Sequence, residues 1–265
     1  MPQRPQRPKL GQNFLVSPTA QAAIADALGD ISHRTVIEIG PGRGAITRIL
    51  ARRARRLVAV ELDRELAAAL RAEFAEQPAV EILSQDVLET DFAALRSGPD
   101  EKLLVVGNLP YYITSDILLK LFAASESVER AVVMIQREVA ERVAAQPGTS
   151  DYGLLSATAQ IYAGVEQLLR LPPSAFSPPP QVHSTVLRLT MHPRFGELGV
   201  SPDEFLPFLR IAFAQKRKML GKNLRTAGYD SGRVAAAFAA CNISPQSRAE
   251  ELDLPTMACL IQHLR

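Results

Sequence analysis

The segment VGNLPYY at 106–112 places an amide, a proline-fixed backbone and an aromatic ring next to one another. The side-chain oxygen of Asn108 and a backbone carbonyl near Leu109 can both accept hydrogen bonds from an exocyclic amine such as adenine N6. An amine held in this way is oriented for in-line attack on an electrophilic methyl group. Tyr111 can stack on a base that has left its helix.

This segment therefore predicts methylation of adenine N6, with Asn108, Leu109, Pro110 and Tyr111 as the catalytic residues. No general base is required, because the product amine can lose its proton after the transfer. The alternative is a strand-to-helix turn in which Asn108 caps the helix and Pro110 only shapes the chain.

A glycine-rich loop, GPGRG at 40–44, follows the apolar run TVIEI at 35–39. Glycines let the backbone approach a ligand closely at the carboxyl end of a strand, where open α/β sheets bind ligands. The spacing is G-x-G-x-G, whereas a dinucleotide-binding loop needs G-x-G-x-x-G. Gly40 and Gly42 are therefore expected to contact a cofactor that lacks a pyrophosphate.

Two acidic residues follow the next two expected strands. Glu61 lies 21 positions after Gly40, where a carboxylate can accept both hydroxyls of a ribose, and Asp86 can accept the exocyclic amine of an adenine. Together with the glycine loop, these residues indicate S-adenosylmethionine rather than NAD as the cofactor. The alternative is a generic strand-to-helix turn with solvated carboxylates.

Short apolar runs that are rich in β-branched residues alternate with helical patterns in the sequence. The expected strands are 35–39, 57–60, 80–83, 103–106 and 131–135, and the expected helices are about 18–28, 45–54, 63–75, 114–124, 137–145 and 153–163. This alternation predicts an α/β fold with a parallel sheet and helices on both faces. A closing pair of strands is expected at 165–170 and 182–191, and the five prolines within 171–180 predict a fixed loop between them.

The periodicity changes after Pro193. Only helices are expected from there on, at 202–215, 217–227, 231–240 and 255–264. The sequence thus predicts a flexible basic tail at 1–9, a sheet-containing domain at 10–192 that holds the cofactor, and a small helical domain at 193–265 that binds RNA.

The composition limits the class of protein. The chain has 265 residues, of which 47% are apolar, and its formal net charge is +2. Such a chain can bury a substantial core, as one large domain or two smaller ones, and disorder is excluded as its dominant state. No run of 18 apolar residues exists and the start lacks the apolar core of a signal peptide. We therefore expect a cytoplasmic monomer with no membrane partner.

The cysteines and histidines carry no predicted function. Two cysteines make a disulfide scaffold or a cysteine-based zinc site improbable, and Cys241 and Cys259 are expected to be buried apolar side chains. The four histidines show no spacing typical of a metal site.

The near-zero net charge is an average over unlike segments. Residues 61–101 contain eleven acidic and three basic residues, whereas residues 31–58 contain seven arginines and one glutamate. Residues 205–229 contain no acidic residue and six basic ones, which are Arg210, Lys216, Arg217, Lys218, Lys222 and Arg225. On helices, these six form a positive face that can contact RNA phosphates. The alternative is a solvated helix end.

The sequence resembles the ribosomal RNA adenine N6,N6-dimethyltransferase family. The similarity covers nearly the whole chain outside the first nine residues and the last helix. The matching segments are QNFL (12–15), VIEIGPGRGAIT (36–47), VAVELD (58–63), SQDVLETDF (84–92), VVGNLPYYITSDIL (105–118), MIQREVAERV (134–143), DYGLLS (151–156), LPPSAFSPPPQVHSTVLRL (171–189) and FAQKRKMLGKNL (213–224).

The resemblance implies a Rossmann-like methyltransferase fold and roles for individual residues. It implies cofactor contacts at Asn13, Leu15, Gly40, Glu61, Asp86 and Asn108. It also implies that Phe176 faces Tyr111 across the target adenine, although Phe176 can instead be a hydrophobic anchor of its loop. Arg43, Gln181 and His183 depart from the residues expected in the family, which puts details of the loop contacts in doubt.

The activity implied is the transfer of methyl groups from S-adenosylmethionine to N6 of two adjacent adenosines near the 3′ end of 16S rRNA, within the small ribosomal subunit or its precursor. Three alternatives stay open. They are a large-subunit (23S) rRNA methylase that confers macrolide resistance, a non-catalytic ribosome assembly factor with the same fold, and a DNA adenine methylase.

Overall fold

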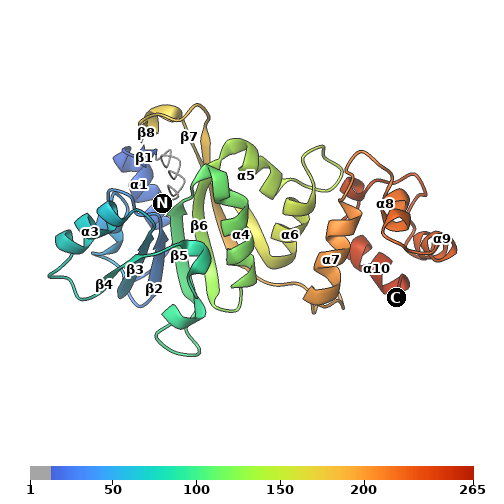
Figure 1. Cartoon of the computed structure of the whole chain (residues 1–265), viewed down its shortest axis with the longest axis horizontal. Helices are drawn as coiled ribbons and strands as arrows, with labels where there is room; N and C mark the ends of the chain where they lie inside the picture. The colour runs from blue at the N-terminus through green and yellow to red at the C-terminus, as the bar shows by residue number, and fades with distance from the viewer. Residues whose placement is uncertain (1–12) are drawn as a thin grey trace, which may run out of the picture. The chain divides into compact units, whose positions relative to one another are not determined.

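The computed structural model describes residues 13–265, so the predicted tail at 1–9 lies outside the described residues. A seven-stranded sheet has the strand order β4-β3-β2-β5-β6-β9-β7 (Figure 1). Its strands are β2 (Thr35–Ile39), β3 (Arg56–Glu61), β4 (Val80–Ser84), β5 (Leu103–Asn108), β6 (Val128–Gln136), β7 (Ala163–Leu171) and β9 (Ser184–Met191). The pairs from β4 through β6 are parallel, which confirms the predicted α/β class.

The central strands are covered on both faces. Every residue of β2 is buried, and so are the first five residues of β5. Successive side chains of a strand point to opposite faces, so burial of all of them requires a layer on each side. On one of these faces, Val36 and Leu104 share an apolar cluster with Ile24 and Leu50, which come from two of the helices.

The helices occupy the places where the helical patterns lie. They are α1 (Pro18–Asp26), α2 (Thr47–Leu50), α3 (Arg64–Glu73), α4 (Thr114–Ala123), α5 (Arg137–Ala144), α6 (Leu154–Tyr162), α7 (Pro202–Ala212), α8 (Leu220–Thr226), α9 (Ser231–Ala240) and α10 (Leu254–His263). Ser17 caps α1 by accepting the Ala20 N–H at 3.4 Å, and Pro18 is the first helical residue. No helix within residues 13–265 combines the length and the apolar character needed to cross a membrane.

Two short strands were not predicted from the sequence. β1 (Phe14–Leu15) pairs antiparallel with β8 (Phe176–Ser177), so that Leu15 lies opposite Phe176. Two residues are too few for an alternating pattern to show in the sequence. β8 follows a 3₁₀ turn, Pro173–Ala175, inside the predicted proline-rich loop.

The prediction of a helix at 217–227 is wrong at its start. Met219 has an extended backbone with φ −59° and ψ 141°, and α8 begins only at Leu220. The amide of Asn223 explains this, because its Nδ2 donates to the carbonyls of Ala212 at 2.7 Å and Gln215 at 3.3 Å. Residues 213–219 therefore form a loop between α7 and α8, which we call the basic loop.

The chain divides into two compact units. One comprises the chain up to residue 137 together with 168–188, and the other comprises 138–167 with 189–265. This division differs from the predicted limit at residue 193. The reason is packing, since Tyr152 and Ile161 share one buried cluster with Phe205 and Phe208 of α7. Hydrophobic periodicity identifies α6 as a helix but does not say which core it joins.

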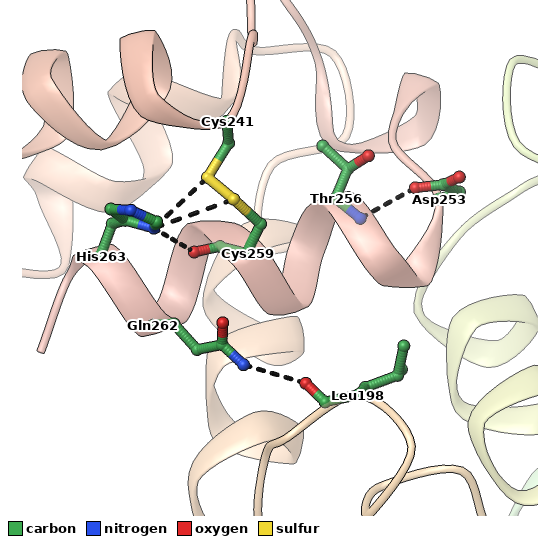
Figure 2. Close-up of a disulfide and its surroundings, with 7 residues drawn as sticks. All are labelled: Leu198, Cys241, Asp253, Thr256, Cys259, Gln262 and His263. Atoms are coloured by element: carbon green, nitrogen blue, oxygen red, sulfur yellow. Dashed lines mark hydrogen bonds between the residues drawn. A yellow bond between two sulfur atoms is a disulfide. The ribbon is translucent and has the colours of Figure 1, made fainter.

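The second unit contains a disulfide between Cys241 and Cys259, which lie 18 positions apart (Figure 2). Both cysteines are only partly buried. The expectation of two free, buried apolar side chains is therefore wrong. Pairing follows from the fold, because Cys241 ends α9 and Cys259 lies in α10, with the two Cα atoms 6.0 Å apart.

Candidate active site

A cavity of about 420 Å³ lies in the first unit. Its position follows from the strand order, because the chain moves outward from β2 to β4 and then returns to place β5 on the other side of β2. Such a reversal opens a crevice at the carboxyl ends of the strands. The cavity is lined by Asn13, Leu15, Gly40, Gly42, Glu61, Asp86, Asn108, Leu109, Pro110 and Tyr111. The fold thus brings together every predicted cofactor and catalytic residue except Phe176.

Glu61 is the last residue of β3 and is only 4% exposed. Its Oε2 accepts the Gly42 N–H at 3.0 Å and its Oε1 accepts the Asp63 N–H at 2.9 Å. Burial raises the pKa of Glu61, while these backbone donors oppose the rise. Each carboxylate oxygen keeps a further lone pair, so the group is fixed in place and can still accept hydroxyls.

The glycine loop turns the backbone toward this carboxylate. Gly40 and Gly42 have φ values of 64° and 57°, a region that favours glycine. The N–H of Gly40 donates to the carbonyl of Val60 at 2.9 Å, which ties the loop to β3. A Cβ added to Gly42 would meet the Phe14 ring at 3.0 Å, so a larger residue would have to displace this ring as well as adopt a positive φ.

Asp86 caps a 3₁₀ turn, Val87–Glu89, that follows β4. Its Oδ1 accepts the Leu88 N–H at 2.8 Å, and this contact orients the carboxylate at the cavity wall. Glu61 and Asp86 thus line the cavity from the ends of adjacent strands, as the order of strands predicted.

Asn108 ends β5 with its amide group oriented by the N-terminal segment. Its Nδ2 donates to the backbone carbonyl of Asn13 at 3.0 Å. This leaves Oδ1 as an acceptor. Leu109 is buried and its N–H donates to the Met134 carbonyl at 3.0 Å, while Thr114 Oγ1 donates to the Pro110 carbonyl at 2.9 Å. The segment is therefore held from β6 and α4 as well as by its proline.

Two tyrosines follow in a 3₁₀ turn, Tyr111–Ile113. The Tyr111 hydroxyl lies 3.0 Å from the Ser184 hydroxyl of β9, which fixes the end of its ring. Tyr112, for which no role was predicted, is 62% exposed and also lines the cavity. Partial burial raises the pKa of Tyr112, and the charges of Asp86 and Glu61 add to this rise. The site thus presents one anchored and one exposed aromatic ring.

Phe176 lies elsewhere. It is 3% exposed, pairs with Leu15 across the β1–β8 ladder, and shares an apolar cluster with Leu171 and Ala175. In this structure it matches the alternative from the sequence, an anchor of the proline-rich loop. Phe176 does not line the cavity, although its partner Leu15 does, and its predicted contact with the target base stays a prediction.

Replacing Phe176 by leucine tests the two roles. As an anchor, leucine keeps most of the apolar volume, so we expect a loss below about 1.5 kcal/mol in the free energy of unfolding and a rate within threefold of wild type. Urea unfolding and single-turnover methylation measure the two quantities. A rate loss of 30-fold or more in a variant of wild-type stability would show that the ring contacts the base.

Phe14 and Arg43 also line the cavity, and their contact with each other was not predicted from the sequence. The guanidinium carbon of Arg43 lies 4.4 Å from the centre of the Phe14 ring, and both residues line the cavity. This contact gives a reason for the charged residue at position 43, where an apolar one was expected. Only the fold brings these distant positions together.

Glu38 is a further group that received no role from the sequence. It lies on β2, is 2% exposed and lines the cavity, and its Oε2 has no hydrogen-bond partner among residues 13–265. Burial raises the pKa of Glu38 to about 7; Thr47 opposes the rise, and the charge of Glu61 adds to it. The signal in the sequence was an acidic residue two positions before the glycine loop.

This raised pKa predicts a pH-dependent cost. The unfolded chain ionises Glu38 near pH 4.5, whereas the folded chain ionises it only near pH 7. The free energy of unfolding is therefore unaffected by this group below pH 4.5 and falls as the pH rises to about 7. Relative to wild type, Glu38→Gln should gain nothing in free energy of unfolding at pH 4 and roughly 3 kcal/mol at pH 8. Denaturant unfolding of ligand-free protein at both pH values measures this, and an equal effect at both would contradict it.

The six predicted RNA-binding residues are all exposed in the second unit. None of them forms an ion pair within the described part of the chain. Lys216, Arg217 and Lys218 lie in the basic loop rather than on a helix, and Lys216 Nζ donates to the carbonyl of Ser150. The amide of Asn223 holds the start of the basic loop, and this role was not predicted from the sequence.

The arginine-rich segment at 31–58 is different. Five of its seven arginines form ion pairs in the first unit, which are Arg34–Glu129, Arg48–Glu73, Arg53–Asp26, Arg55–Glu101 and Arg56–Glu81. The positive charge that the sequence shows here is therefore largely neutralised by acidic residues that are distant in the chain.

Comparisons with known proteins show the family of the chain. The family model for ribosomal RNA adenine dimethylase matches residues 4–264. A ribosomal RNA small subunit methyltransferase A from Acidobacterium capsulatum is 60% identical over 254 residues, which is 96% of this chain and 89% of the relative. One from Koribacter versatilis is 52% identical over an alignment of 268 residues, covering 97% and 94%.

Solved structures show the same architecture. A dimethyladenosine transferase from Plasmodium falciparum has a TM-score of 0.76 at 24% identity, covering 93% of this chain and 95% of that one. The 23S rRNA methyltransferase ErmE has a TM-score of 0.72 at 27% identity, covering 95% and 99%. The full-length match of the family model and the 60% identity together show that this chain belongs to the ribosomal RNA adenine dimethylase family.

Proposed function

We propose that this protein transfers methyl groups from S-adenosylmethionine to N6 of two adjacent adenosines near the 3′ end of 16S rRNA, and so takes part in small-subunit biogenesis. The observation that carries the proposal is the Asn108 amide, whose Nδ2 is held by the Asn13 carbonyl at 3.0 Å so that Oδ1 is left for a substrate amine. It lies in one cavity with Glu61 and Asp86.

The polar groups that line the cavity match those of the cofactor. Glu61 suits the ribose hydroxyls because its two oxygens are already fixed by backbone N–H groups. Asp86 suits the adenine amine, and Gly40 and Gly42 bring the backbone near without side chains. When bound, S-adenosylmethionine supplies an electrophilic methyl group on a sulfonium. The buried Glu38, whose Oε2 has no hydrogen-bond partner among residues 13–265, lines the same cavity.

The substrate base is held by the catalytic segment. Asn108 Oδ1 and the Leu109 carbonyl accept the two N6 hydrogens, which orients the nitrogen lone pair along the line of attack. Tyr111 supplies a ring whose hydroxyl is anchored on Ser184. The exposed ring of Tyr112 lines the same opening and offers a second stacking surface for RNA. The proton leaves the product amine to solvent, so no side chain has to act as a base.

The RNA is contacted by exposed cations of the second unit. The six residues from Arg210 to Arg225 form no ion pair with the described residues, and all except Lys216, which donates to the Ser150 carbonyl, are available for phosphates. We further propose that the protein acts as a monomer in the cytoplasm.

The small-subunit substrate is favoured over the large-subunit one by sequence identity. The relatives named small subunit methyltransferase A reach 60%, against 27% for the 23S rRNA methyltransferase. Incubating purified small and large subunits from an unmodified strain with the enzyme and labelled cofactor tests the choice. We expect dimethyladenosine at two adjacent positions of the small-subunit rRNA, mapped by mass spectrometry; label in the large subunit alone would overturn the proposal.

A further inference from the structure

A cluster of two sulfurs and one imidazole lies in the second unit, in the region shown in Figure 2. Cys259 and His263 are one turn apart on α10, and Cys241 reaches them from the end of α9. His263 Nδ1 lies 3.7 Å from Cys241 Sγ and 3.8 Å from Cys259 Sγ. His263 is exposed and both cysteines are half-buried, so solvent reaches the cluster.

These distances match a metal centre. Tetrahedral Zn²⁺, with Zn–S of about 2.3 Å and Zn–N of about 2.0–2.1 Å, holds sulfur and nitrogen ligands about 3.6 Å apart and two sulfurs about 3.8 Å apart. Both sulfur–nitrogen distances are therefore already close to those of a metal site. The two sulfurs, which are bonded to each other in the disulfide, have to separate, and His263 Nδ1 has to leave the Cys259 carbonyl, from which it lies 2.9 Å.

We propose that, once the disulfide is reduced, Cys241, Cys259 and His263 bind one Zn²⁺ ion, with water as the fourth ligand. Two thiolates and an imidazole are ligands that this borderline-soft cation prefers. The site is separate from the cavity of the first unit, since all three residues belong to the second unit.

Reduction of the disulfide needs two electrons and two protons, and metal binding releases the protons again. A dithiol reductant is oxidised to its own disulfide, while the Cys241–Cys259 bond takes up two electrons and each sulfur gains a proton. The two thiols then release these protons as they bind the cation. His263 Nδ1, which lies 2.9 Å from the Cys259 carbonyl and donates to it, must lose its proton and carry it on Nε2 instead.

As a consequence, α9 and α10 are cross-linked in an oxidising medium and in a reducing medium that contains the metal ion. The disulfide joins the end of α9 to α10 in an oxidising medium, and the metal ion joins the same two helices in a reducing one. Only the reduced, metal-free protein lacks this cross-link. A cross-link at this place constrains the 18-residue separation between the cysteines in either state.

Cobalt is a suitable probe, because it takes the place of zinc and absorbs light according to its ligands. We expect the full-length protein, reduced with a dithiol and desalted without oxygen, to bind one Co²⁺ per chain. It should then show thiolate-to-cobalt absorption in the near ultraviolet and the visible bands of a tetrahedral site. Zn²⁺ should displace the cobalt, and the oxidised protein should show no such spectrum.

Variants make the assignment specific. Cys241→Ser and Cys259→Ser should each abolish the thiolate–cobalt spectrum, and His263→Gln should weaken binding at least tenfold. The matched control is His192→Gln, an exposed histidine of the same unit that pairs with Glu197 and should leave binding unchanged. Circular dichroism checks folding, and His263→Gln decides the matter if a cysteine variant does not fold.

Two results would overturn the proposal. One is the absence of cobalt binding by the reduced wild-type protein at micromolar concentration. The other is a spectrum that His263→Gln leaves unchanged in both intensity and affinity, because the cation would then be held by other groups.

Discussion

Replacing Asn108 by alanine should lower the single-turnover rate of adenine methylation by about 10³-fold, which is the upper end of the effect of removing one preorganised polar group from an active site. The amide is the one side chain in the catalytic segment that offers an acceptor to the substrate amine. Its orientation depends on the hydrogen bond from Nδ2 to the Asn13 carbonyl. Alanine removes both the acceptor and this tether.

The affinity for small-subunit RNA should stay within about threefold of wild type, because phosphate contacts supply most of it. Filter binding measures this affinity, and quenched single-turnover assays measure the rate. Asn242→Gly is a matched control, since this exposed asparagine has φ 54°, which glycine adopts easily, and lies in the other unit. Methylation by Asn108→Ala at near wild-type rate would refute the proposed role of the amide.

Removing four exposed cations of the second unit should weaken RNA binding by about 100-fold or more at physiological salt. The variant replaces Arg217, Lys218, Lys222 and Arg225 by alanine and keeps Lys216, which donates to the Ser150 carbonyl. Each phosphate contact contributes roughly 0.7 to 0.9 to the slope of log affinity against log salt, so the slope should fall by about 3. Titrations at several salt concentrations give both numbers.

The control uses arginines that are paired within the protein. Arg53→Ala with Arg55→Ala also removes positive charge, but Asp26 and Glu101 already neutralise these two side chains. We expect the salt slope to change by less than about 0.5 for this pair. An equal loss of slope per charge in both variants would show that net charge, rather than the basic loop and α8, determines RNA binding.

Much of the fold could be predicted from the sequence, because local patterns decide it. The mostly apolar, buried runs from Thr35–Ile39 to Leu103–Asn108 are strands of the central sheet, and the glycine loop lies at the predicted strand end. The cavity could be predicted for the same reason, since Glu61, Asp86 and Asn108 each follow a parallel strand and such ends meet at one edge.

Loop and helix limits were harder to predict because they depend on single distant contacts. The start of α8 is set by Asn223, whose amide holds the carbonyls of Ala212 and Gln215. The two-residue strand of Phe176 exists only because Leu15 lies opposite. A helical period or an alternation has to extend over several residues before it shows in a sequence, and these contacts do not.

By itself, the sequence determined the α/β class and the order of the residues that line the cavity, and it predicted their chemistry, because residue type and spacing carry this information. The tertiary structure alone decided which charges stay unpaired, where the ring of Phe176 lies, and that Cys241, Cys259 and His263 meet. The physical reason is the same in each case. Ion pairs, packing and covalent or metal cross-links need atoms within a few ångströms, and only the folded chain brings residues that are distant in sequence so close together.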